Sequence, residues 1–385
     1  MKRMGWMLVV CCLLLGLLPL GADAAALEVA GKSAVLMDVA TGTVLYESNS
    51  HEPLAPASVT KVMTMLLIME AIDSGKIGWD DSVTASEAAA AKGGSQIYLK
   101  VGETMSVTDM VKSIAVSSAN DCACAMAEHL AGSEGAFVEQ MNARAKELGM
   151  NDTNFVNCTG LDDAPDAANH KTSAYDIALM SRELLKNHPD IKKFTTIGMD
   201  TVRGGAFGLA NTNKMVRFYS GCTGLKTGFT SGAGYCLSAS AERDGMELVA
   251  VVMGSDTSQN RFAACKSMLD YGFANFALYH PALQEGASVP VVLGKSGSVN
   301  AVPAEQAALL VEKGQLSSVT SEVTLEESVT APVSHGQRLG MLTIKAGEQV
   351  LSQIPLVAET AVERKGWGDL FVEILRRVAM AKPEA

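Results

Sequence analysis

Ser58 and Lys61 are the two residues whose types and spacing first suggest covalent chemistry. They lie in the run Pro56-Ala57-Ser58-Val59-Thr60-Lys61, directly before the apolar run 62–69. Such a run is typical of a buried helix, and Pro56 suits the first helical position because the N–H that proline lacks would have been unpaired there. Residues three apart share a helix face, so the Lys61 amine can reach the Ser58 hydroxyl. The stretch therefore pairs a candidate nucleophile with a candidate base.

The backbone at Ser58 could also stabilise negative charge. N–H groups in the first turn of a helix have no partner inside the helix, so that of Ser58 is free to donate to an oxyanion. A Ser-x-x-Lys quartet also arises by chance in long sequences, and a serine near a helix start is often a capping residue. The rest of the chain must decide between catalysis and capping.

The composition is that of an exported globular protein. The chain has 385 residues, 48% hydrophobic and 19% charged, which is enough for one large core and a smaller module. Residues 1–24 begin with Lys2 and Arg3, continue through an apolar stretch and end in Ala22-Asp23-Ala24, as a cleavable signal peptide does. The net charge of −11 argues against nucleic acid as a partner.

Cysteine and histidine give no metal-binding pattern. An even number of cysteines in an exported chain permits disulfides, here with 15 possible pairings, whereas the usual burial of cysteine favours free thiols. The histidines form no i, i+4 pair and have no neighbouring Cys-x-x-Cys motif, so we expect no metal. The cysteines that follow the predicted signal peptide are Cys122, Cys124, Cys158, Cys222, Cys236 and Cys265.

The order of the predicted elements indicates an α+β fold. A hairpin over 33–47 leads into the helix of Ser58, and a block of helices follows at 107–116, 121–130, 133–148 and 173–185, with Asn120 as the N-cap of the second. From residue 222 the pattern changes to strand, turn, strand, turn, strand, and a helix over 262–273 follows. Strands before and after a helical block can meet in one sheet, which defines this class.

The region after residue 281 reads as a separate small module. Short β-type runs at 289–293, 308–311, 319–325, 339–344 and 350–357 predict an all-β domain. The last segment is amphipathic, with Trp367, Leu370, Phe371, Ile374, Leu375 and Val378 on one face. It is too short and too charged to span a membrane, so it either packs on the β domain or lies in a lipid interface. The predicted division is 1–24, 25–282, 283–362 and 363–385.

Two further motifs follow the Ser58-x-x-Lys61 pair. They are Ser118-Ala119-Asn120 and Lys226-Thr227-Gly228. Together the three motifs resemble those of the serine-acylating penicillin-binding family. With the Gly160-Leu161-Asp162 segment and the C-terminal elements, the chain is most similar to D-alanyl-D-alanine carboxypeptidases of the penicillin-binding-protein-5 type. The resemblance covers practically the whole mature chain and implies a β-lactamase/transpeptidase-like domain, a small all-β domain and a C-terminal amphipathic helix.

The chemistry requires an activated hydroxyl. Ser58 becomes a nucleophile only if a base takes its proton, and Lys61 can be that base only when neutral. A buried amine near a second cation has a depressed pKa, and Lys226 is the candidate cation. By resemblance, Ser118 passes the proton to the leaving D-alanine and Asn120 orients the substrate amide.

The resemblance also assigns the substrate-binding positions. Lys226, Thr227 and Arg261 would hold the terminal carboxylate, although Arg261 could instead be a surface charge at a helix start. The N–H groups of Ser58 and Phe229 would bind the oxyanion. Gly228 completes the third motif.

Three positions depart from the family pattern. Thr212 stands where the family has a second arginine, Thr159 where some relatives have a histidine, and Phe229 where a polar residue is usual. These departures concern side-chain preference and the rate of deacylation, and they leave the reaction class unchanged.

The function implied by the resemblance is removal of the terminal D-alanine from peptidoglycan pentapeptide stems through a Ser58 ester. β-Lactams would be inhibitors, no cofactor would be needed, and the last helix would hold the enzyme to the outer face of the cytoplasmic membrane. One alternative is a β-lactamase, but the closest match to its Glu-x-x-Leu-Asn segment, residues 183–187, has leucine and lysine shifted and lies in a predicted helix. The other is a non-catalytic cell-wall-binding protein, which the intact motifs argue against.

Overall fold

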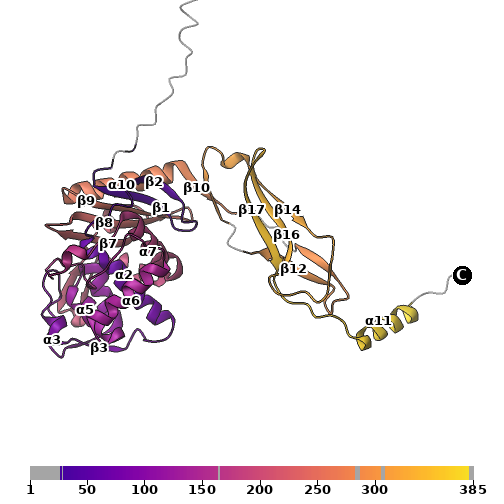
Figure 1. Cartoon of the computed structure of the whole chain (residues 1–385), viewed down its shortest axis with the longest axis horizontal. Coiled ribbons are helices and arrows are strands. Elements are labelled where there is room, and N and C mark those ends of the chain that lie inside the picture. The colour runs from indigo at the N-terminus through magenta and orange to yellow at the C-terminus, as the bar shows by residue number, and fades with distance from the viewer. Residues whose placement is uncertain (1–26, 28, 164, 282–286, 305–307, 381–385) are drawn as a thin grey trace, which may run out of the picture.

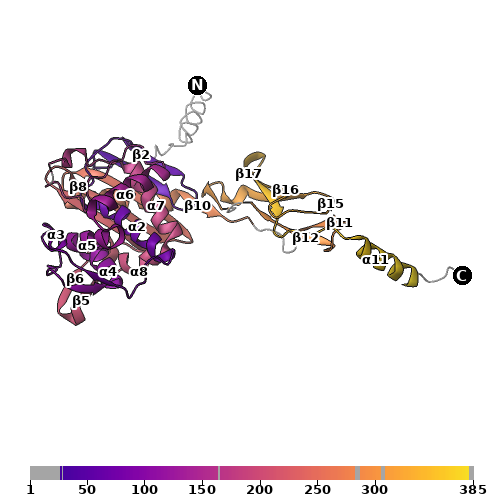
Figure 2. The same ribbon diagram turned by 60° about the horizontal axis from the view of Figure 1, so that its bottom comes forward.

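A computed structural model describes residue 27 and residues 29–163, 165–281, 287–304 and 308–380, with side chains up to residue 376. The predicted signal peptide, residues 1–24, lies outside this described part. The chain forms a large helix-and-sheet domain, then an elongated β domain, then a single helix, and the three follow one another in a row (Figure 1). Figure 2, turned by 60°, shows the same order.

A five-stranded antiparallel sheet forms the centre of the first domain. Its strand order is β2-β1-β9-β8-β7, so the N-terminal hairpin joins the later meander through the pairing of β1 with β9. The predicted α+β class is confirmed. β7 lies at the edge of the sheet, and its outer side is therefore open to a ligand. The strands are β1 Ser33–Asp38, β2 Val44–Ser48, β7 Cys222–Thr230, β8 Gly234–Arg243 and β9 Met246–Ser255.

Helices cover both faces of this sheet. Along β9, Val249, Val251 and Met253 belong to the core shared with α2, whereas Leu248 and Val252 belong to a second core under α10. Alternate residues of a strand point to opposite faces, so one strand serves both cores. Figure 1 shows α10 on one side of the sheet and α2, α5, α6 and α7 on the other. These helices are α2 Lys61–Asp73, α4 Val107–Ser117, α5 Asn120–Ala131, α6 Glu134–Glu147, α7 Ala174–Asn187 and α10 Ser258–Asn275.

The helix starts correct several predictions. Pro56 lies outside the helix and precedes a 3-10 turn, η1 (Ala57–Thr60), from which α2 continues. Asn120 is the first residue of α5 rather than its N-cap, which is Ala119 and makes no side-chain cap bond. The asparagine side chain is used elsewhere, as described below. α10 begins four residues earlier than predicted, because Thr257 caps it through the N–H of Asn260.

Short elements complete the first domain. Two of its two-stranded sheets, β3 with β4 and β5 with β6, lie outside the central sheet. The elements are β3 Ser82–Thr84, α3 Glu87–Ala90, β4 Thr104–Ser106, η2 Ala167–Asn169, η3 Pro189–Ile191, α8 Lys192–Thr195, β5 Met199–Val202, η4 Arg203–Gly205, β6 Phe207–Ala210 and α9 Met215–Phe218.

The second domain is a six-stranded sheet with its own core and the strand order β14-β16-β17-β12-β11-β15. The predicted run 308–311 instead forms β13, which pairs with β10 directly after α10. Strand β12 was not predicted, because its buried and exposed residues alternate around polar Ser298 and Asn300. The elements are β10 Phe276–Tyr279, β11 Ser288–Val292, β12 Ser298–Pro303, β13 Leu309–Glu312, η5 Leu316–Ser318, β14 Val319–Leu325, β15 Val329–Thr330, β16 Arg338–Ala346 and β17 Gln349–Ala358.

The chain continues into α11 (Trp367–Met380), as predicted. Its apolar side chains are open to solvent: Trp367 is 90% exposed, Phe371 64% and Ile374 60%. In both views α11 extends beyond the β domain instead of lying against its sheet (Figures 1 and 2). None of the helices in the described part is both long and apolar enough to cross a bilayer.

Candidate active site

The η1 turn brings Ser58 and Lys61 together as predicted. The Lys61 Nζ lies 3.0 Å from the Ser58 Oγ, and the lysine side chain is fully buried. Ala57, directly before Ser58, has φ +48°, in the left-handed region that is unusual for a residue with a Cβ. This backbone conformation is a strain that the surrounding structure must hold in place.

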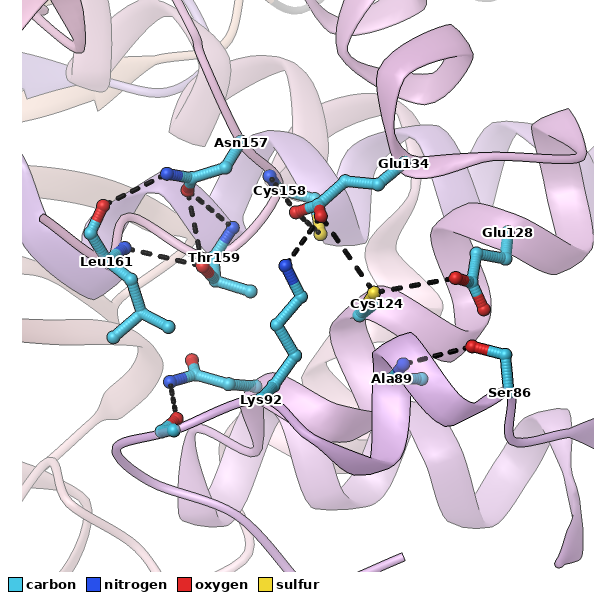
Figure 3. A network of polar contacts seen from close by, with 12 residues as sticks. Ser86, Ala89, Lys92, Cys124, Glu128, Glu134, Asn157, Cys158, Thr159 and Leu161 are labelled. Carbon is cyan, nitrogen blue, oxygen red and sulfur yellow. Dashed lines mark hydrogen bonds and ion pairs between the residues drawn. The ribbon is translucent and has the colours of Figure 1, made fainter. Parts of the chain in front are cut away.

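A compact turn over residues 157–161 holds the other side of Lys61. The Lys61 Nζ donates to the Thr159 carbonyl oxygen at 2.7 Å. The Asn157 Oδ1 accepts from the N–H groups of Thr159 and Gly160, and the Asn157 Nδ2 donates to the Leu161 carbonyl. Figure 3 shows the bonds that join Asn157 to Thr159 and Leu161. The turn therefore fixes a carbonyl oxygen that orients the Lys61 amine toward Ser58.

The same turn is tied to α6 by a carboxylate. Glu134 accepts from the N–H of Cys158 at 3.3 Å and from its thiol at 3.2 Å, and pairs with Lys92 at 2.6 Å. The thiol of Cys124 lies against the same carboxylate (Figure 3). All six described cysteines are free thiols, five of them buried and Cys222 half-buried.

Ser118 and Asn120 lie at the junction of α4 and α5. Ser118 ends α4 with φ +63°, and α5 begins two residues later at Asn120. The Asn120 Nδ2 donates to the Gly93 carbonyl at 2.7 Å. The Ser118 Oγ and the Asn120 Oδ1 are both buried and have no hydrogen-bond partner within the described part of the chain. Buried polar atoms are rarely left unpaired, so these two are available to a ligand.

Strand β7 lies beside the η1 turn and carries Lys226, Thr227 and Gly228. A Cβ at Gly228 would lie 2.6 Å from the Pro56 carbonyl oxygen and 3.1 Å from the Ser58 nitrogen. Only glycine lets the strand approach the η1 turn so closely. Lys226 is buried and donates to the Thr227 carbonyl at 2.8 Å.

Thr227 is linked to one of the positions that depart from the family pattern. The Thr227 Oγ1 donates to the Thr212 Oγ1 at 2.7 Å, so Thr212 lies against strand β7. The sequence alone gave no partner for Thr212, because fifteen residues separate it from Thr227. A hydroxyl bonded to Thr227 thus stands where the family pattern has its second arginine.

Arg261 reaches the same strand from α10. Its side chain is buried, so the alternative of a surface charge at the helix start is wrong. The Nη1 donates to the Gly228 carbonyl at 2.8 Å, and the Nε has no partner within the described residues. Phe229 is 53% exposed and stacks on Tyr235 with ring centroids 4.3 Å apart. The Arg261 guanidinium lies over the Tyr235 ring.

The two buried amines have lowered pKa values. Burial lowers the pKa of Lys61 to about 7, so a large fraction is neutral near physiological pH. Burial also lowers the pKa of Lys226, and the positive charges of Lys61 and Arg261 lower it further. The prediction of a depressed Lys61 pKa is therefore supported, but its main cause is burial and the repulsion between the amines acts on Lys226.

One cluster elsewhere has metal-ligand residue types. Glu70, Glu183 and His188 bring ligand atoms together, the only such group in the described part of the chain. Arg144 already donates to Glu70 and to Glu183 at 2.7 Å each. The guanidinium neutralises these carboxylates, so the cluster is an ion-pair network. It also engages Glu183, the residue from which the closest β-lactamase-type segment begins.

Comparison with known proteins shows which family the chain belongs to. Residues 21–257 match the family model described as D-alanyl-D-alanine carboxypeptidase, and residues 279–364 match the penicillin-binding protein 5 C-terminal domain. The chain belongs to the D-alanyl-D-alanine carboxypeptidase family. The prediction of this family and of its hydrolase activity is confirmed.

Similar proteins align with most of the length of this chain. D-alanyl-D-alanine carboxypeptidase DacF of Bacillus subtilis is 44% identical over 353 residues, which are 90% of this chain and 88% of DacF. DacA of Escherichia coli K12 is 33% identical over 86% of this chain and 83% of its own. The structure of penicillin binding protein 5 from Haemophilus influenzae has a TM-score of 0.75 at 31% identity, covering 88% of this chain and 98% of that one.

Proposed function

We propose that this carboxypeptidase acts through an ester on Ser58. The Ser58 Oγ attacks the carbonyl carbon of the bond between the two terminal D-alanines, and Lys61 accepts the hydroxyl proton. The C–N bond then breaks, the last D-alanine leaves as an amine, and water hydrolyses the ester. The observation that carries the proposal is the 3.0 Å approach of a fully buried Lys61 amine to the Ser58 hydroxyl.

Ser118 and Asn120 are proposed to serve the leaving group and the substrate backbone. The Ser118 hydroxyl would deliver a proton to the departing nitrogen, and the Asn120 Oδ1 would accept from the amide N–H of the acyl side. Their buried and unpaired atoms support both roles, because a bound peptide would supply the missing partners. The bond from the Asn120 Nδ2 to Gly93 supports this role, because it leaves the oxygen of the same amide available to a ligand.

Strand β7 is proposed to bind both negative charges in the reaction, the terminal carboxylate and the oxyanion. Lys226 and Thr227, with Arg261 behind them, would hold the terminal carboxylate. The N–H groups of Ser58 and Phe229 would donate to the oxyanion of the tetrahedral intermediate. The close approach of Gly228 to the Ser58 nitrogen supports this arrangement, because it brings the strand and the turn to one point.

The proposed substrate is the pentapeptide stem of peptidoglycan, with β-lactams as inhibitors that acylate the same hydroxyl. Penicillin-Binding Protein D2 from Listeria monocytogenes has structures in ampicillin-bound and cefotaxime-bound forms, with a TM-score of 0.56 to this chain. They share 32% identity and cover 64% of this chain. The proposed chemistry requires no metal or cofactor.

We also propose the division and placement of the chain. Residues 1–24 direct export, 25–282 form the carboxypeptidase domain, 283–362 form a stalk, and 363–385, which include α11, hold the protein to the outer face of the cytoplasmic membrane. The exposed apolar side chains of Trp367, Phe371 and Ile374 support a lipid-interface role. Removal of residues 363–385 should release the protein from membranes and leave its activity on small soluble peptides unchanged. Unfolding of the truncated protein would show instead that the helix is part of the fold.

The catalytic proposal is tested with Ser58→Ala. Mass spectrometry of a pentapeptide-stem substrate should show loss of one D-alanine with the wild-type chain and none with the variant. Labelled penicillin should attach to the wild-type chain at Ser58 and leave the variant unlabelled. Labelling of a different serine in the variant would refute the assignment.

A further inference from the structure

We propose that His170 and Thr60 are positioning residues that aim the Ser58 N–H at the oxyanion. The inference rests on the proposed acylation of Ser58. It arises from a chain of three hydrogen bonds that begins at the backbone of residue 156 and ends at Ala57, the residue before the nucleophile. Thr60 occupies an unspecified position of the Ser58-x-x-Lys61 motif, and His170 lies outside the three motifs.

The direction of the chain follows from its first donor. The Val156 N–H donates to the His170 Nδ1 at 3.1 Å, and a backbone N–H can only donate. The Nδ1 is therefore unprotonated, and in the neutral ring the Nε2 carries the hydrogen. The Nε2 lies 2.8 Å from the Thr60 Oγ1 and donates to it. His170 is 4% exposed, and burial lowers its pKa to about 4, so the ring is neutral at physiological pH.

Thr60 then has one hydrogen left to give. Its Oγ1 donates to the Ala57 carbonyl oxygen at 2.8 Å. Because the imidazole already donates to the hydroxyl oxygen, the hydroxyl hydrogen is directed at Ala57. Hydrogen bonds arranged in such a series strengthen one another.

The Ala57 carbonyl determines where the Ser58 N–H points. The peptide bond between Ala57 and Ser58 is planar and trans, so its C=O and N–H point in opposite directions. Fixing the carbonyl oxygen therefore fixes the N–H. Ala57 has φ +48°, and this strained conformation needs such a restraint.

The backbone at Gly160 lies against the same carbonyl. A Cβ at Gly160 would lie 1.8 Å from the Ala57 oxygen and 2.7 Å from the Thr60 Oγ1. The carbonyl is thus in contact with both the Thr60 hydroxyl and the Gly160 backbone. A rotation of this carbonyl would break its bond to Thr60.

The test measures the rate of acylation by labelled benzylpenicillin per titrated active site in the full chain. Thr60→Val should slow acylation about 10- to 100-fold, less than the 10²- to 10³-fold loss on removing an oxyanion donor outright. Thr60→Ser keeps the hydroxyl and should stay within about threefold of wild type. His170→Phe should slow acylation, and His170→Gln should restore most of the rate because its amide can donate to Thr60. The double variant Thr60→Val/His170→Phe should be no slower than Thr60→Val.

A second readout separates aiming from general damage. A D-alanine-derived boronic acid forms a tetrahedral anionic adduct, so its affinity should fall by the same factor as the acylation rate, with little change in the KM for a peptide substrate. Ser181→Ala is the matched control, because it removes another buried hydroxyl, paired with Ser238 at 2.9 Å. It should lower thermal stability and leave the rate per site unchanged.

Three results would overturn the proposal or its basis. Wild-type acylation per site in both Thr60→Val and His170→Phe would overturn the positioning role. Slowed acylation with unchanged boronic acid affinity would also overturn it, because the defect would then lie outside the oxyanion site. Absence of labelling at Ser58 in the wild-type chain would instead refute the proposed function itself.

Discussion

The rate of acylation should depend on pH through the protonation of Lys61. Burial lowers the pKa of this amine from its usual 10.5 to about 7. The amine can accept the Ser58 proton only when it is neutral, which is above its pKa. Acylation should therefore be slow below pH 7, rise through pH 7 and reach a plateau above it.

The size of the rise follows from the titration of one group. With a pKa of about 7, the neutral fraction of Lys61 is about 9% at pH 6 and about 91% at pH 8, a tenfold change. A lysine with the ordinary pKa of 10.5 would be less than about 1% neutral at pH 8. Its rate would continue to rise about tenfold per pH unit up to pH 10. The position of the bend thus separates a buried base from an ordinary one.

The assay is single-turnover acylation by labelled penicillin from pH 5 to 10, normalised to the number of active sites. Lys61→Arg is the control, because a guanidinium remains charged throughout this range. The variant should acylate slowly and show no bend near pH 7. A wild-type rate that keeps rising to pH 10, or a Lys61→Arg variant with the wild-type profile, would refute Lys61 as the neutral base.

Two further substitutions test the proposed role of Arg261 and the turn at Gly160. Arg261→Ala should weaken substrates with a free terminal carboxylate by about 1.5–3 kcal/mol, the usual worth of a charged hydrogen bond. Equal losses on a substrate whose terminal carboxylate is esterified would show that Arg261 acts only through its bond to Gly228. Gly160→Ala should lower both stability and acylation, because residue 160 has φ +80° and the new Cβ would meet the Ala57 carbonyl. Thermal unfolding and labelling measure the two effects, and a variant with wild-type values would show that the turn can move aside.

Local spacing was sufficient to predict the pair at the centre of the site. Ser58 and Lys61 are three residues apart, and a turn brings such residues onto one side whether it is α-helical or 3-10. The assignment of Ser118 and Lys226 to the same site as Ser58 rests on resemblance, because no periodic pattern relates residues so far apart in the chain. The α+β class was predictable because strand runs lay on both sides of the helical block.

The contributions of backbone and neutral side chains could not be predicted. The Thr159 carbonyl that orients Lys61 carries no residue-type signal, since every residue has one. His170 was a scattered histidine in the sequence, and its value as a neutral donor depends on burial and on the Val156 N–H. Asn120 was misjudged as a cap because asparagine favours that position, whereas tertiary contacts with Gly93 determine its use.

The site combines features that cost stability elsewhere in proteins. Lys61 is held with its amine out of water, and Ser118, Asn120 and Arg261 each keep a buried polar atom without a partner in the described chain. Each unpaired buried atom costs about 1–3 kcal/mol. Ser33 and Asp38 on β1 each have one as well, so an unpaired atom alone does not mark a site. In the proposed site, a bound peptide would supply the partners that the atoms of Ser118, Asn120 and Arg261 lack. The large core between α2 and the sheet makes this cost tolerable, because nine residues of α2 are buried around the reactive turn.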